Sequence, residues 1–217
     1  MSDVIPFSTA LRERSSGAHR SSEHAGFMAK LVGGEGTRED YIALVEQHWF
    51  IYDALEAAAE RMRADPIAAM FISDKLTRLH ALASDLEFLI GPDWKDKITP
   101  LPTTKRYVAR INEVGATWPG GFVAHHYTRY LGDLSGGLYI GRVLARQFGF
   151  ETNGIGFYLF ADIADPKSFK EHYREQLDAA PWDAQEQARV IDEVLLAYQF
   201  NTDLFDDLAT ARATAVA

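Results

Sequence analysis

The amino-acid sequence predicts an all-α protein, and three observations support this. Apolar residues recur at the three- and four-residue spacing of helices along nearly all of the chain. Capping residues and Gly or Pro stops divide this pattern into segments of helical length. Only the segment 149–165 is compatible with a strand. Since no repeat, linker or low-complexity segment interrupts the pattern, we expect one helical domain over residues 1–217.

Each expected helix begins at a capping residue or follows a stop. In chain order, the helical elements are expected to begin at Ser8 or Thr9, Thr37, Asp65-Pro66, Ser73, residue 103, Gly120, residue 166 and residue 183. The first helix runs from Ser8 or Thr9 to Gly33-Gly34, because its apolar spacing continues through Leu31. Thr37 is followed three residues later by Asp40, a pattern typical of a capping box.

The segment from Gly120 to Phe148 is predicted to be one helix interrupted by glycines. These glycines are Gly132, Gly136, Gly137 and Gly141. Each interior glycine costs roughly 1 kcal/mol relative to alanine, so such a helix usually bends or lies closer to a neighbouring group than a Cβ allows. Gly132 and Gly136 share a face, and Asp133 lies beside it. Two explanations remain open: close packing of helices, or a ligand pressed against the helix backbone.

Composition excludes several classes of protein. The chain has 217 residues, a net charge of −9 and no cysteine. The acidic charge argues against general nucleic-acid binding, and the lack of cysteine excludes disulfides, zinc–thiolate sites and iron–sulfur clusters. The N-terminal residues lack a signal-peptide pattern, and no apolar run is long enough to span a membrane. We therefore expect a cytoplasmic protein with neither a nucleic-acid partner nor a membrane segment.

The histidines offer one candidate metal ligand. A di-iron carboxylate site needs Glu-x-x-His pairs, and none of the seven histidines has Glu three residues before it. His19 is followed at i+4 by Glu23, and a metal-bound histidine typically donates its second ring N–H to such a partner. The alternative is a half-exposed histidine in an ordinary helical pair. His24 is a rival ligand five residues further on.

The remaining polar candidates are assigned as follows. His48 and His80 fall on apolar faces and are predicted to be packed or surface-edge histidines, and His125 and His126 to be structural. Lys170 and Arg174, one helical turn apart, form either a solvated face or a clamp for an anionic ligand.

Several segments resemble the haem oxygenases, and together they cover about residues 8–208. The segment Val123–Gly137 resembles the family's glycine-rich signature, and the run from Ala18 to Met28 resembles its proximal-ligand helix. Two further blocks that match are Phe169-Lys170 with Tyr173-Arg174-Glu175, and Phe200-Asn201 with Phe205. The resemblance implies a helical bundle in which haem lies between an N-terminal proximal helix and a kinked distal helix.

The resemblance also implies roles for individual residues. His19 is expected to be the proximal iron ligand, supported by Glu23. Gly132 and Gly136 are expected to let the distal backbone approach the porphyrin, while Asp133 organises a network of waters that delivers protons. Arg129 is the fourth expected catalytic residue, and Tyr52 extends this network. The residues expected to contact haem are Arg12, Glu23, Tyr127, Gly137, Lys170, Arg174, Asn201 and Phe205.

The implied reaction is cleavage of haem b at a meso carbon to biliverdin, CO and ferrous iron. It requires O2 and an external electron donor, a reductase or a ferredoxin, because the sequence has no flavin, nicotinamide or iron–sulfur motif. The basic pair at Lys170 and Arg174 is expected to orient haem for cleavage at the α position. Arg12 stands where relatives commonly have Lys, which changes the hydrogen-bond geometry there.

The chain resembles the soluble bacterial haem oxygenases, and we expect a monomer. Two alternatives remain: a haem carrier or sensor on the same fold that does not turn haem over, and an all-α scaffold without haem in which the glycines only pack helices.

Overall fold

The computed structural model describes residues 5–23 and 25–216, without the side chains of Glu23, Ala215 and Val216. This part of the chain is helical and contains no strand, as the sequence predicts. The α-helices are α1 (Phe7–Glu23), α2 (Gly26–Val32), α3 (Arg38–Met62), α4 (Leu79–Ile90), α5 (Trp94–Lys97), α6 (Pro102–Thr117), α7 (Pro119–His126), α8 (Leu138–Phe148), α9 (Pro166–Ala179) and α10 (Ala184–Val216). The shorter helical turns are η1 (Ala68–Met70), η2 (Asp74–Leu76), η3 (Tyr127–Leu131), η4 (Asp133–Gly137) and η5 (Gly156–Tyr158).

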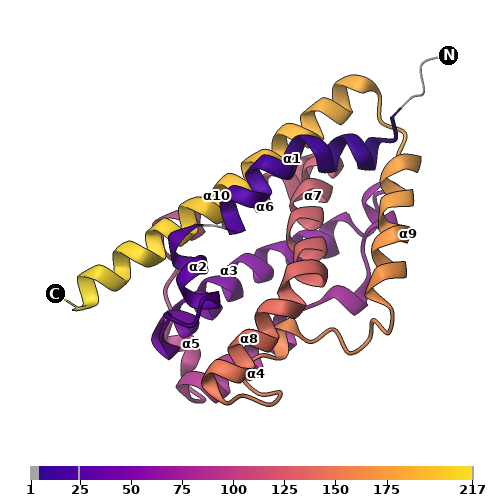
Figure 1. The fold of residues 1–217 in the computed structure, drawn as a ribbon. Helices are drawn as coiled ribbons and strands as arrows, with labels where there is room; N and C mark the ends of the chain where they lie inside the picture. Colours follow the sequence, from indigo (N-terminus) through magenta and orange to yellow (C-terminus); the bar gives the residue numbers. More distant parts are fainter. Residues whose placement is uncertain (1–4, 24, 217) are drawn as a thin grey trace.

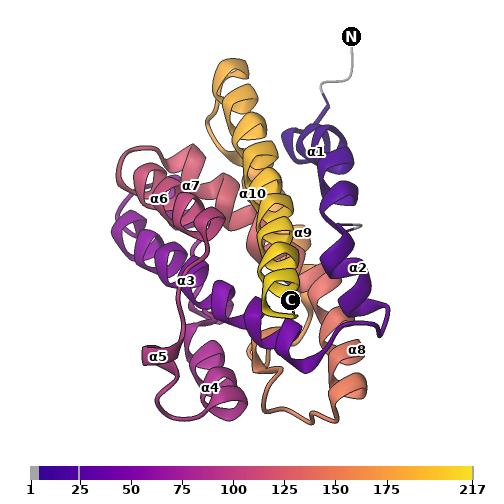
Figure 2. The same ribbon diagram turned by 90° about the vertical axis from the view of Figure 1, so that its left-hand side faces the viewer.

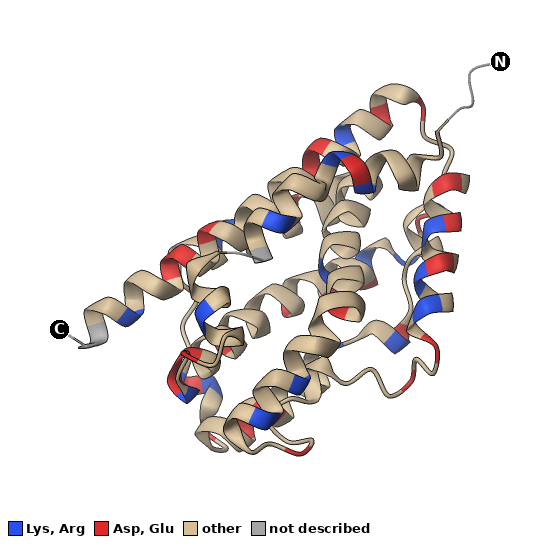
Figure 3. Ribbon diagram, viewed as in Figure 1, with Lys and Arg blue, Asp and Glu red and all other residues tan. Residues whose placement is uncertain are grey.

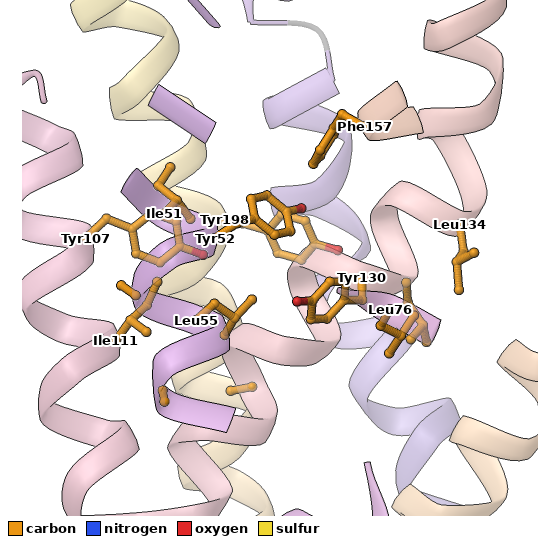
Figure 4. Packing of buried hydrophobic residues seen from close by; sticks show 14 of the residues in the cluster. Ile51, Tyr52, Leu55, Leu76, Tyr107, Ile111, Tyr130, Leu134, Phe157 and Tyr198 are labelled. Atoms are coloured by element: carbon orange, nitrogen blue, oxygen red, sulfur yellow. The ribbon is translucent and has the colours of Figure 1, made fainter. Parts of the chain in front are cut away.

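The long C-terminal helix α10 organises the bundle. Helix α1 packs along α10, and the path α7–η3–η4–α8 starts beside α10 and runs away from it to α8 (Figure 1). In Figure 2, α3 and α6 lie side by side on one side of α10, with α1 and α2 on the other. Figure 4 shows the core between α3 and α6, where Ile51 and Leu55 approach Tyr107 and Ile111.

Several helices begin or end at the capping residues and glycines that the sequence predicted. Thr37 and Asp40 form the expected capping box: the Asp40 N–H donates to Thr37 Oγ1 at 3.2 Å, and the Thr37 N–H donates to Asp40 Oδ2 at 2.8 Å. Gly91 ends α4 with a φ of 98°, a conformation that other residues rarely adopt. These contacts are local in sequence, which is why the sequence predicts them.

The prediction of one helix from Ser8 or Thr9 to Gly33-Gly34 was wrong. Helix α1 ends at Glu23, Ala25 is extended with a ψ of 132°, and α2 starts at Gly26. Apolar spacing continues across this break because Leu11 in α1 and Leu31 in α2 are buried in the same core.

Ser73 does not cap α4, contrary to prediction. It precedes η2 and makes no capping hydrogen bond with its side chain. Helix α4 begins six residues later, where Glu56 Oε1 of α3 accepts from the N–H groups of Arg78 at 2.5 Å and Leu79 at 3.0 Å. A carboxylate from another helix therefore satisfies the first donors of α4. The short helix α5 was also not predicted.

The segment 149–165, the one place where the sequence allowed a strand, contains the turn η5 instead. Asp85 of α4 is buried and accepts from the N–H groups of Gly156 at 2.9 Å and Phe157 at 2.8 Å. This carboxylate holds the segment in a tight turn, so its backbone donors need no partner strand.

The glycine-rich segment forms one helical path with two consecutive wide π turns, η3 and η4. Such turns are rare in proteins overall, and those that occur often lie at functional sites. Close packing applies at Gly141, and a ligand against the backbone at Gly132 stays a prediction. A Cβ at Gly141 would lie 2.6 Å from Tyr158 Cβ, whereas a Cβ at Gly132 would meet nothing within 4 Å. Gly141 therefore packs against the segment after α8, and Gly132 faces open space.

This contrast predicts opposite effects on stability. We expect G141A to lower the free energy of unfolding by about 1–3 kcal/mol, because the added methyl overpacks against Tyr158. The matched control G132A adds the same methyl in open space and is expected to leave stability unchanged or to raise it by up to about 1 kcal/mol. Urea unfolding of both variants measures this difference. Equal destabilisation of the two would contradict the assignment.

Candidate active site

A pocket of about 550 Å³ opens between the N-terminal helices, the glycine-rich path and α10. Its volume lies in the range of small-molecule sites, which is roughly 300–1,000 Å³. Helix α1 contributes His19 and the π turns contribute Gly132, Gly136 and Gly137. More than a hundred positions in the sequence separate His19 from the other predicted site residues at this cavity. The predicted site residues that line it are eight: His19, Arg129, Gly132, Asp133, Gly136, Gly137, Asn201 and Phe205.

His19 is half-buried at this pocket and contacts Tyr198 of α10 edge to face, with ring centroids 5.5 Å apart. Ser22, one helical turn further along α1, also lines the pocket. The side chain of Glu23 and the residue His24 lie outside the described part of the chain, so the expected support of His19 by Glu23 stays a prediction. Tyr198 was not predicted from the sequence.

Gly132 gives the pocket a wall of bare backbone. Its φ of −61° and ψ of −49° are ordinary helical values, so the backbone conformation there does not require glycine. Because a Cβ at this position would project into open space, the lack of a side chain serves the cavity. A flat ligand can approach the helix backbone more closely at a glycine than at a residue that carries a side chain.

A polar cluster lies behind this wall. The Tyr52 hydroxyl of α3 donates a hydrogen bond to Asp133 Oδ2. The buried guanidinium of Arg129 donates from Nε to the Tyr52 oxygen at 3.3 Å and from Nη1 to Asn201 Oδ1 of α10 at 2.7 Å. Arg129, Asp133 and Asn201 all line the pocket, as does the predicted Phe205. The predicted network of Arg129, Tyr52 and Asp133 is therefore in contact.

Burial controls the protonation of this cluster. Burial raises the pKa of Asp133 to about 6, although Arg129 and the hydrogen bond from Tyr52 both act to lower it. The pKa of Tyr52 is raised well above its ordinary value, again chiefly by burial and also by Asp133. Tyr52 is therefore a hydrogen-bond donor at neutral pH, and Asp133 exchanges a proton near that range.

The predicted anion-binding residues lie beside η3 and η4 but do not line the pocket. Lys170 Nζ of α9 donates to Ser135 Oγ at 3.0 Å and to the Leu134 carbonyl at 3.3 Å. Burial raises the pKa of Tyr127, and the nearby positive charges of Arg174 and Arg12 oppose this. Figure 3 shows Lys and Arg alternating with Asp and Glu along α9. The alternating charges are those of a solvated face, and the anion clamp stays a prediction.

Sequence reasoning missed His48 as a pocket residue. It was expected to be packed or at a surface edge, and the structure shows it buried and lining the cavity. Its position four residues before Tyr52 was the available signal, because both then share one face of α3. Tyr158 lines the pocket from η5 without any local sequence signal.

The structural roles predicted for His125 and His126 are confirmed. His125 Nε2 lies 2.8 Å from Glu193 Oε1, and His126 Nδ1 lies 2.9 Å from the Tyr173 hydroxyl. Both rings are buried and line no part of the pocket.

The residues at the pocket fit a haem better than a bare metal ion. Within residues 5–23 and 25–216, no three His, Asp or Glu side chains group as a metal site. His19 as the expected ligand suits an iron whose other ligands come mainly from a porphyrin. The bare backbone at Gly132 supplies the space that a flat ring needs.

Comparison with known proteins decides the family. The family model described as "Heme oxygenase" matches residues 5–207. The chain belongs to the haem oxygenase family. Members of this family are enzymes that degrade haem, so the expectation of an enzyme holds.

Relatives and solved structures agree with this membership. Heme oxygenase 1 of Pongo abelii is 37% identical over 211 residues, covering 95% of this chain and 73% of the relative. Heme oxygenase 1 of Synechocystis is 33% identical over 204 residues, covering 94% of this chain and 85% of the relative. The crystal structure of Synechocystis heme oxygenase-1 in complex with heme has a TM-score of 0.90 at 32% identity and covers 98% of both chains.

A bacterial relative outside the cyanobacteria is also similar. The heme oxygenase of Leptospira interrogans has a TM-score of 0.88 at 32% identity, covering 93% of this chain and 98% of that one. None of the helices in the described ranges combines the length and apolar character needed to cross a membrane.

The raised pKa of Asp133 predicts a pH-dependent stability. The folded protein keeps the Asp133 proton up to about pH 6, whereas the unfolded chain loses it near the ordinary value of 3.8. Stability contributed by this proton is therefore present below pH 4 and is lost as pH rises through 6. Relative to D133N, the wild type should lose roughly 2 kcal/mol between pH 4 and pH 7. Denaturant unfolding across this range measures the difference, and a difference independent of pH would contradict it.

Proposed function

We propose that this haem oxygenase binds haem b in the pocket and cleaves it at the α-meso carbon to biliverdin, CO and ferrous iron. The observation that carries this proposal is one cavity that combines the half-buried His19, a wall of glycine backbone and the carboxylate of Asp133. When bound, haem supplies both the iron that activates O2 and the porphyrin ring that is oxidised. We further propose that residues 1–217 act as one monomeric domain with its core at about 8–208.

His19 is proposed to hold the iron through a neutral imidazole nitrogen. Its partly buried position in α1 orients the ring toward the pocket, and Tyr198 limits its rotation by an edge-to-face contact. Glu23, at i+4, is proposed to accept the second ring N–H and so to fix the tautomer.

The glycine wall and Asp133 are proposed to have separate roles on the distal side of the haem. Gly132, Gly136 and Gly137 leave no side chain that could donate directly to a ligand beside the wall. Asp133 holds a proton at Oδ and passes it through waters, while Tyr52 and Arg129 keep the carboxylate in place. Arg129 is itself held by Asn201.

The basic cluster is proposed to bind the haem carboxylates and so to select the meso carbon. Lys170 already contacts η4, while Arg174 and Arg12 lie close enough to Tyr127 to influence its hydroxyl. Gly137 and Phe205 contact the ring itself in this proposal. Charged pairs at a surface are individually weak, but several acting together can fix one orientation.

An external electron donor, a reductase or a ferredoxin, is proposed to supply the electrons. The second candidate function is a haem carrier or sensor on the same fold. The buried carboxylate favours the enzyme, because a site that only stores haem needs no titrating group in its pocket.

The assignment of His19 makes a direct prediction. We expect H19A to lose the absorption and resonance signature of histidine-ligated iron on haem titration, because His19 is the proposed iron ligand. H24A is the matched control, since it removes the rival histidine five residues away, and should keep the signature. The reverse pattern would refute the assignment of His19.

Reconstitution tests the activity and its regiochemistry. With haem, O2 and a reductase system, the wild type should lose its Soret band and yield biliverdin IXα, as identified by chromatography. In K170A/R174A we expect a mixture of meso isomers, because the haem carboxylates lose their fixed partners. A stable Soret band would support the carrier, and a dominant β or δ isomer from the wild type would contradict the proposed orientation.

A further inference from the structure

His48 is a buried polar group in the pocket to which the proposed mechanism assigns no role. Its side chain is 8% exposed and lines the cavity beside Leu44. Its Nδ1 atom is enclosed and has no hydrogen-bond partner among the described residues. Buried polar atoms nearly always have a partner, so this enclosed and unpaired nitrogen constrains which ring nitrogen carries the proton.

The surroundings define the chemical form of the ring. Burial lowers the pKa of His48 well below its ordinary value, and the charge of Arg129 adds to this effect. A neutral imidazole carries one N–H, and an unpaired enclosed donor is less tolerated than an unpaired acceptor. The proton therefore belongs on Nε2, which is not among the enclosed atoms that lack a partner.

Neighbouring side chains fix the ring near the polar cluster. The Phe157 ring lies 4.8 Å away, centroid to centroid, and Tyr52 lies 6.1 Å away at an angle of 73°. The ionisable groups around this part of the pocket are Tyr52 from α3, Arg129 from η3, Asp133 from η4, Tyr158 from η5, Tyr198 from α10 and His19 from α1. His48 thus shares the cavity with a cluster whose polar atoms can complete the shell of a water.

We propose that His48 is a positioning residue, whose Nε2–H donates to a water in the pocket that also bonds the Tyr52–Asp133–Arg129 cluster. This water extends the polar network from Asp133 into the inner part of an otherwise largely apolar cavity. The inference rests on the proposed proton-delivering role of Asp133.

Three substitutions separate a hydrogen-bonding role from a packing role. H48L fills similar space without a polar atom. H48Q can place its amide nitrogen near the position of Nε2, whereas H48N places it near Nδ1. A hydrogen bond from Nε2 is therefore restored by Gln and not by Asn.

The first readout uses the full-length chain without haem. Titration of the Asp133 carboxyl carbon by NMR should show its pKa raised by roughly 0.5–1 unit in H48L and H48N, because a donor to the carboxylate network is lost. In H48Q the wild-type value should return. An unchanged Asp133 titration in H48L would overturn the proposal.

The second readout uses the haem complex. Conversion of bound haem to bilin should slow about 5- to 10-fold in H48L and H48N, which corresponds to the loss of one hydrogen bond, and should recover in H48Q. Equal rates in all variants, or equal loss in H48L and H48Q, would contradict the positioning role. If the wild type converts no haem, the proposed function fails, while the Asp133 titration still tests His48 by itself.

Discussion

The hydrogen bond from Tyr52 to Asp133, beside the buried guanidinium of Arg129, is the interaction on which the pocket depends. Removing a carboxylate and a guanidinium from water costs several kcal/mol per ion, roughly, unless each has partners. Asn201 supplies the remaining partner of Arg129. The cluster thereby connects α3, the two π turns and α10. The hydrogen bond that acts on the pKa of Asp133 therefore also holds elements of the pocket together.

The glycine-rich path serves this cluster in two ways. Gly141 allows η5 to pack against α8 through Tyr158, which closes one side of the cavity. Gly132 keeps the backbone beside the cluster bare. Because the π turns widen the helix, Asp133 and the glycines can face one cavity although they are adjacent in sequence. Gly141 therefore serves the packing of helices, whereas Gly132 borders the cavity.

The sequence predicted the features that depend on local spacing. The capping box at Thr37, the stop at Gly91 and the association of Asp133 with bare glycines follow from residues within one or two turns. It did not predict the break before α2, the cap that Glu56 gives to α4, or the turn that Asp85 holds at η5. These depend on side chains from helices far away in sequence. For His48, the sequence offered only its position one helical turn before Tyr52, because an apolar helix face by itself gives no sign that a cavity lies against it.

The central claim is that Asp133 supplies protons to the reaction from a buried, network-held carboxylate. Single-turnover conversion of bound haem in D133A, compared with the wild type at the same haem occupancy, tests it most directly. We expect D133A to bind haem with unchanged affinity and to convert it at least about 10-fold more slowly, as is typical when a general acid is lost. Conversion of haem by D133A at the wild-type rate would contradict the account.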